Sequence, residues 1–359
     1  MSSIVKSIKI TENKKRKVIE GHGNGAKKRQ DIGDTLTIVP VIEEKYIETV
    51  ITEKMFIGKI ISKKETSRLV KELSDAFPLE EKSHLKRVKW TDEKDIFEII
   101  IRPLLPNEPV EGVLSFSLKY VLGESHVNTN GLSDTVIVRD IPKTPAWTYS
   151  QFKEAVKFWP VQFRENKYIE RALKDQLFSS EERSNIQMYM EMCLRVGKNG
   201  DENVGCVIVD PVNSNVVAVS HDCRHQHPLQ HAVMVAIELV AKGQGGVESW
   251  NINSEHVLSL TYDKADEEKK IAELTLLKSK DVKSSLPYLC TKYDLYVSRE
   301  PCIMCAMALV HSRIHRVFYA TETSCGALGS HWKLHLQNGL NHHYEVFKVI
   351  LPQNTLNAT

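Results

Sequence analysis

The sequence Pro301-Cys302-Ile303-Met304-Cys305 follows the predicted strand 295–298 after two residues and opens a segment with helical spacing. A proline in the first turn of a helix loses no hydrogen bond, so a helix is predicted to begin here. The two cysteines are three residues apart and therefore share one face of that first turn. Free backbone N–H groups and the helix dipole stabilise thiolates there, and the thiolate is the form that binds metal ions. The motif therefore predicts a metal site where a buried strand meets a helix.

We expect the third ligand to be His231, at the start of a predicted helix over 230–241. A lone histidine at a helix start is more often a capping or surface residue, but the helix–strand–helix order brings it opposite Cys302 and Cys305. One His and two Cys form a three-ligand set, typical of catalytic zinc sites with an open fourth position. Zinc deaminases of nucleobases carry this set as H-x-E…P-C-x-x-C, with the glutamate as general acid/base. Val233 stands at the glutamate position, so the sequence predicts Zn²⁺ binding and no catalytic residue.

Two later segments resemble the tRNA adenosine deaminases of the cytidine-deaminase-like superfamily, namely 306–320 (AMALVHSRIHRVFYA) and 326–346 (GALGSHWKLHLQNGLNHHYEV). The valine at 233, the segments 157–160 (KFWP) and 288–298 (YLCTKYDLYVS), and the long N-terminal extension resemble the non-catalytic subunit of the eukaryotic heterodimeric enzyme. The resemblance covers about residues 180–350. It implies a homologous catalytic deaminase subunit as partner, tRNA as ligand, and conversion of the wobble adenosine to inosine by the complex.

The pattern over 181–359 alternates helices and strands and predicts a three-layer α/β/α, cytidine-deaminase-like domain. A polar stretch at 244–287 is predicted to be a surface insertion. The expected helices are 181–196, 230–241 and 302–311, and the expected strands are 204–209, 216–220, 295–298 and 316–320.

Residues 40–145 show the order β-α-β-β-α-β, which predicts an α+β domain of the ferredoxin-like type. Residues 146–180 form a connector rich in aromatic side chains, which we expect to pack along a domain surface. The expected strands are 55–61, 84–90, 96–102 and 135–141, and the expected helices are 64–76 and 110–122.

The overall net charge of +2 hides a basic N-terminal arm, predicted to be flexible over 1–39. Its clusters Lys14–Lys17 and Lys27–Arg29 resemble a bipartite nuclear import signal, so we expect the protein in nucleus and cytoplasm. The arm could equally bind RNA or be a solvated tail. Seven cysteines without a secretion signal indicate a reducing compartment, and no apolar run is long enough for a membrane span.

Lys86, Arg87 and Lys89 cluster on the predicted strand 84–90 and could neutralise RNA phosphates, or form an ordinary solvated strand edge. Two other functions remain open: a stand-alone zinc-stabilised RNA-binding protein, and an active cytidine or deoxycytidylate deaminase, against which Val233 argues. We do not expect Glu300 to replace the missing acid/base. Further expectations are that His225 and His227 lie in a surface loop and that Cys223, Cys290 and Cys325 are small core residues.

Overall fold

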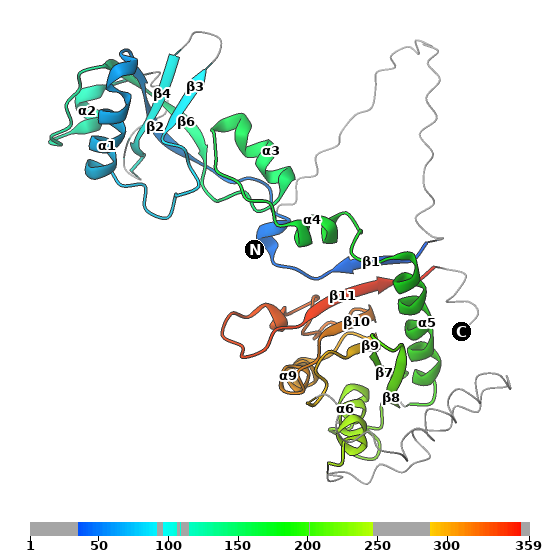
Figure 1. The fold of residues 1–359 in the computed structure, drawn as a ribbon. Helices are drawn as coiled ribbons and strands as arrows, with labels where there is room; N and C mark the ends of the chain where they lie inside the picture. The colour runs from blue at the N-terminus through cyan, green and yellow to red at the C-terminus, as the bar shows by residue number, and fades with distance from the viewer. Residues whose placement is uncertain are drawn as a thin grey trace, which may run out of the picture.

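The computed structural model describes residues 35–91, 96–105, 108, 115–200, 202–246 and 288–352. The predicted import signal and nearly all of the predicted insertion lie outside these residues. Within them the chain forms two separate sheets, each covered by its own helices (Figure 1). No helix in this described part of the chain is both long and apolar enough to cross a membrane.

The larger sheet has six strands in the order β1-β11-β10-β9-β7-β8. β9, β10 and β11 are parallel to one another, whereas β7, β8 and β1 each run antiparallel to their neighbours. The strands are β1 (Thr37–Pro40), β7 (Gly205–Asp210), β8 (Asn215–His221), β9 (Asp294–Arg299), β10 (Arg316–Thr321) and β11 (Glu345–Ile350).

Helices cover both faces of this sheet. α5 (Ser180–Gly197) begins at a capping box and buries Tyr189, Met190 and neighbouring apolar residues against one face. α6 (Ala232–Gly243) and α9 (Ile303–His311) pack together against the other face. The three layers confirm the predicted α/β/α domain, and they place the starts of α6 and α9 close together.

The smaller sheet is antiparallel, with the order β3-β4-β2-β6-β5. α1 joins β2 to β3, and β4 lies between those two strands, which is the arrangement of a split βαβ unit. This confirms the predicted ferredoxin-like order. The elements are β2 (Thr52–Ile60), α1 (Thr66–Ala76), β3 (Val88–Thr91), β4 (Ile96–Pro103), β5 (Phe116–Ser117), α2 (Leu118–Leu122) and β6 (Leu132–Pro142), with the short 3-10 helices η1 (Glu44–Tyr46) and η2 (Lys63–Glu65). The second helix is shorter than predicted because residues 116–117 pair with β6 instead.

The aromatic connector folds into α3 (Tyr149–Phe158) and α4 (Lys167–Leu173). Trp159, at the end of α3, is fully buried against Met55 and Ile100 of the smaller sheet, and its indole N–H donates to the Lys86 carbonyl at 2.6 Å. The connector therefore packs along a domain surface, as predicted.

One boundary differs from the prediction. Residues 37–39, expected at the end of the flexible arm, and Pro40, expected at the start of the smaller domain, form strand β1 at the edge of the larger sheet, with Thr37 opposite Ile350 and Pro40 opposite Phe347. The chain thus begins its described part in the C-terminal domain, leaves it to build the smaller domain, and returns through α4. Four residues whose partner strand lies at the far end of the chain carry too little local pattern for sequence to reveal this pairing.

Candidate metal centre

The structure brings the three predicted ligands together where α6 and α9 begin. His231 is the N-cap of α6, Cys302 is the N-cap of α9, and Cys305 lies in the first turn of α9. Their ligand atoms all lie within 4.8 Å of one another, and Cys302 Sγ is 3.7 Å from His231 Nδ1. Ligand atoms of a tetrahedral zinc, with bonds of about 2.0–2.3 Å, are separated by roughly 3.5–3.8 Å. The donor set and its spacing therefore fit zinc.

The two thiols are electrostatically unequal. The Cys305 thiol donates a hydrogen bond to Cys302, which lowers the pKa of Cys302 to about 5 and raises the pKa of Cys305. Backbone N–H groups at the start of α9 further stabilise the Cys302 thiolate. These contacts favour the thiolate form of Cys302, and a bound cation would displace the proton of Cys305.

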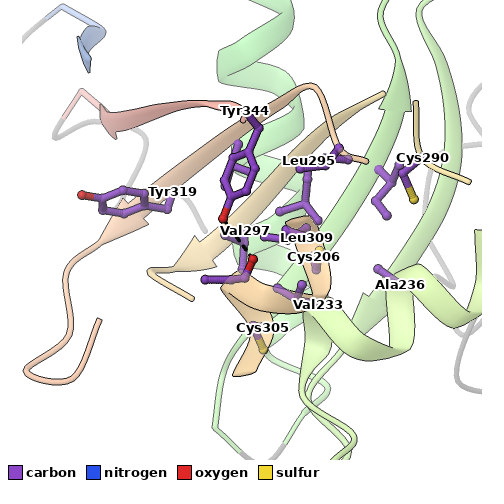
Figure 2. Packing of buried hydrophobic residues seen from close by; sticks show 14 of the residues in the cluster. Cys206, Val233, Ala236, Cys290, Leu295, Val297, Cys305, Leu309, Tyr319 and Tyr344 are labelled. Atoms are coloured by element: carbon purple, nitrogen blue, oxygen red, sulfur yellow. Dashed lines mark hydrogen bonds between the residues drawn. The ribbon is translucent and has the colours of Figure 1, made fainter. Parts of the chain in front are cut away.

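Val233 lies beside this ligand set, in the first turn of α6. It is 2% exposed and belongs to the buried apolar cluster that also holds Cys305 and Val297 (Figure 2). Together with the three ligands it lines a cavity of about 180 Å³. The position from which a glutamate could reach a metal-bound water therefore presents only methyl groups.

Glu300, just before the metal motif, is 3% exposed and already fully engaged. Its carboxylate accepts hydrogen bonds from the backbone N–H groups of Thr323, Leu328 and Ser330, at 3.3, 2.9 and 3.0 Å. A side chain at Gly326 would collide with this carboxylate, which shows how closely the loop 323–330 wraps it. Glu300 therefore holds a loop against the metal turn, and the expectation that it does not replace the missing acid/base is consistent with these contacts.

A second charged group at the cavity was not anticipated. Asp222 is 2% exposed, and both of its carboxylate oxygens accept from Arg224 Nε, at 2.8 and 3.1 Å. Glu202 bridges Arg224 and Arg299, at 3.6 and 3.3 Å. No motif predicts this network, because its members come from two separate loops and the end of β9. Among the described residues that line the cavity, each carboxylate is thus bound to arginine or to backbone.

Other predicted residues divide into two groups. His225 and His227 are exposed in the loop before α6, and Cys223 and Cys290 are buried, as predicted. The prediction for Cys325 is wrong: its side chain is exposed, because it lies on the surface loop that Glu300 holds.

The structure alters the prediction that Lys86, Arg87 and Lys89 together bind RNA phosphates. Arg87 is turned inward, and its guanidinium donates to the carbonyls of Leu73, Phe77, Ile100 and Ile101 at 2.8–3.2 Å. Burial lowers its pKa to about 10. Arg87 therefore ties the end of α1 to β4 and is removed from the phosphate-binding prediction, because its donors are occupied. Lys86 remains exposed, and Lys89 donates to the Phe158 carbonyl at the surface.

Comparisons with known proteins match both domains. The pattern described as the cytidine and deoxycytidylate deaminase zinc-binding region matches residues 183–321, and the tRNA-specific adenosine deaminase TAD3 N-terminal domain matches residues 54–159.

Relatives match over nearly the whole chain. The "Probable inactive tRNA-specific adenosine deaminase-like protein 3" of Danio rerio is 40% identical, over 93% of this chain and 97% of its own length. The Homo sapiens protein with the same name is 38% identical, over 88% and 90%. The "tRNA-specific adenosine deaminase TAD3" of Arabidopsis thaliana is 27% identical, over 83% and 92%. With its zinc ligand set, its buried Val233 and these matches, the chain belongs to the tRNA-specific adenosine deaminase-like protein 3 (TAD3) family.

Proposed function

We propose that this chain is the non-catalytic subunit of a tRNA adenosine deaminase that converts the wobble adenosine of the anticodon to inosine. The observation that carries the proposal is the buried Val233 beside a complete His231, Cys302 and Cys305 ligand set. Among the described residues that line the cavity, three fit zinc and none is free to carry a proton. This combination supports a structural role for the zinc site within a larger enzyme.

Deamination of a nucleobase needs a zinc-activated water and a group that carries protons to the ring and to the leaving amine. Val233 cannot carry a proton, Glu300 is bound by three backbone N–H groups, and Asp222 is paired with Arg224. Loss of a positioned acid/base typically lowers the rate by a factor of about 10²–10⁴. The glutamate must therefore come from another chain.

We infer that this other chain is a homologous deaminase subunit, which forms a heterodimer with the domain over 181–352. Relatives named as subunits of tRNA-specific adenosine deaminase in Schizosaccharomyces pombe and Saccharomyces cerevisiae support this assignment. In such a pair the present chain contributes a dimer surface and a grip on tRNA, while its partner performs the chemistry.

The grip on tRNA is assigned to the smaller domain, with Lys86 and Lys89 as its phosphate contacts. Lys86 lies next to the end of α3, because its backbone N–H donates to the Pro160 carbonyl, and Lys89 donates to the Phe158 carbonyl two residues away. Trp90, which follows Lys89 on β3, is 57% exposed. Lysines beside an exposed aromatic ring suit RNA, since they pair with phosphates and the ring can stack on a base.

Co-purification tests the proposal. The chain is expressed with an affinity tag in cells of the organism it comes from. It is then purified through the tag, and the proteins bound to it are identified by mass spectrometry. The expected result is one homologous chain that carries H-A-E at the position of His231–Val233, in equal amount. Recovery of the tagged chain with tRNA but with no such homologue would instead indicate a stand-alone RNA-binding protein.

We also propose, from the basic clusters Lys14–Lys17 and Lys27–Arg29, that the protein is present in nucleus and cytoplasm. Fluorescence of a tagged chain tests this directly. Replacing both clusters with alanine should abolish the nuclear fraction, and an unchanged distribution would contradict the proposal.

A further inference from the structure

Residues 41–48, here called the tether, lead from β1 to the smaller domain and are fastened to the larger one. Val41 N–H donates to the Val346 carbonyl at 2.8 Å, and the Val41 carbonyl accepts from His335 Nε2 at 3.0 Å. Lys333 Nζ donates to the Ile42 carbonyl at 3.0 Å. The carbonyl groups of Val41 and Ile42, at the start of the tether, are therefore held by side chains of the segment 333–335.

The other end of the tether is fastened to the smaller domain. Gln151, on α3, donates through Nε2 to the carbonyls of Lys45 and Glu48, at 2.8 and 2.9 Å. Trp147 meets the Tyr46 ring edge-on at 6.3 Å. Because α3 packs on the smaller sheet, a shift of the tether moves that whole domain.

Two routes of contact join the tether to the zinc-binding helix. In the first, the Tyr344 hydroxyl donates to the carbonyl of Ala306, the residue that follows the ligand Cys305, at 3.1 Å (Figure 2). The Tyr344 ring stacks on His335 at 5.9 Å, and His335 donates to Val41. Ala306, Tyr344 and His335 are at most 4% exposed, so this route is buried along its length.

The second route is buried at Glu300 and Leu328 and reaches the surface at Lys333. Glu300, next to the metal turn, accepts from the Leu328 N–H, and Leu328 pairs with Lys333 in a β-bridge. Lys333 then reaches the Ile42 carbonyl and the Glu44 carboxylate, at 3.0 and 2.7 Å. Both routes begin within two residues of a zinc ligand and end on the tether.

The tether packs only partly against the larger domain: Val41 contacts the buried cluster, and the rest of the tether is half-buried or exposed. A cavity of about 190 Å³ lies beneath it, lined by Val41, Tyr46, Tyr168, His335 and Tyr344 among others. A junction with this much open volume has few dispersion contacts to fix its geometry. The hydrogen bonds of His335 and Lys333, together with that from the Val41 N–H to Val346, therefore contribute much of what fixes the start of the tether.

We propose that Tyr344, His335 and Lys333 are positioning residues that couple the zinc site to the orientation of the smaller domain. In a chain without the acid/base, the metal then serves to order α9, and through it the tether that carries the RNA-binding domain. The consequence for tRNA rests on the proposed function, whereas the coupling itself does not.

Hydrogen–deuterium exchange of residues 36–46 in the zinc-loaded full chain tests the coupling. Tyr344→Phe removes the bond to Ala306 and keeps the ring. Its matched control is Tyr189→Phe: Tyr189 is equally buried and donates to the Ser214 carbonyl at the same 3.1 Å, but lies on α5. We expect Tyr344→Phe to retain zinc and to speed exchange at 36–46 about fivefold, as expected for one lost hydrogen bond, and Tyr189→Phe to leave it unchanged.

Zinc removal by a chelator, in the wild-type chain and in Tyr344→Phe, tests whether the metal and Tyr344 act through the same contacts. Removing zinc from the wild-type chain should speed exchange at 36–46, and should add less in Tyr344→Phe, where the buried route is already broken and only the Lys333 route remains. If Tyr344→Phe fails to fold, Lys333→Met provides the same comparison at the surface, with Lys333→Arg expected to restore protection. Unchanged exchange at 36–46 in the folded variants, or after zinc removal, would overturn the coupling.

Kinetics of the complex with its catalytic partner separate this inference from the proposed function. Tyr344→Phe should raise KM for tRNA about threefold or more and leave kcat unchanged, because the partner's chemistry is untouched. A fall in kcat alone would contradict a positioning role. If the wild-type complex does not deaminate tRNA, the proposed function fails, while the exchange result still decides the coupling.

Discussion

Arg87→Met gives a sharp test of how the smaller domain is built. The Arg87 guanidinium donates to four backbone carbonyls, two at the end of α1 and two on β4. Methionine fills a similar volume and offers no donor, so these buried oxygens lose their charged partner. Leaving a buried polar group unpaired costs about 1–3 kcal/mol, and some of these carbonyls retain other partners. We therefore expect a total loss of about 3 kcal/mol.

For a domain of this size that loss corresponds to a fall in Tm of about 15 °C. The loss in free energy of unfolding is measured by urea titration, with tryptophan fluorescence as the signal. Trp159 reports on this domain because its ring is buried in it. Lys86→Ala is the matched control: Lys86 is adjacent and exposed, so its removal should leave stability within about 0.5 kcal/mol.

The RNA assay should give the opposite pattern. Lys86→Ala should reduce the slope of log K against log salt for tRNA binding by about one, because one phosphate contact is lost. Arg87→Met, measured well below its Tm, should leave the slope unchanged. A stable Arg87→Met chain with a reduced salt slope would refute the structural reading of Arg87 and restore it to the phosphate-binding surface.

Three further results are expected. Cys302→Ala or Cys305→Ala should abolish zinc binding by elemental analysis and lower Tm, because ligand bonds contribute to folding, and a zinc-free wild-type chain would contradict this. Burial lowers the pKa of His335 to about 4, so between pH 6.5 and 4 the unfolded chain binds a proton that the folded chain excludes. Stability should therefore fall by about 2 kcal/mol from pH 7 to pH 5 through this residue, and His335→Gln should lose that part of the slope in urea titrations. Val233→Glu should yield no inosine from the lone chain, because the added carboxylate enters a buried apolar cluster and loses its hydration there.

The parts of the structure that sequence predicted are those with local physical signatures. Pro301 and the cysteine spacing identify the start of α9, apolar runs identify β7 and β9, and the exception at Val233 is visible because its neighbours match a motif. What sequence missed depends on contacts between distant segments. β1 pairs with a strand at the other end of the chain, and Arg87 points inward although lysines surround it. The Arg87 side chain points inward because it pairs with the carbonyl groups at the end of α1. The pattern of apolar and polar residues in the sequence does not reveal these carbonyls.

The central claim is that this chain binds zinc without performing chemistry, and an inosine assay on wobble-adenosine tRNA tests it most directly. Four samples are compared: the wild-type chain alone, the wild-type complex, the complex with Val233→Glu, and a complex whose partner lacks its own catalytic glutamate. We predict inosine only in the two complexes with an intact partner, at similar rates. Inosine from the lone chain, or from the complex with the glutamate-less partner, would contradict the account, because the proton carrier would then have to reside in this chain.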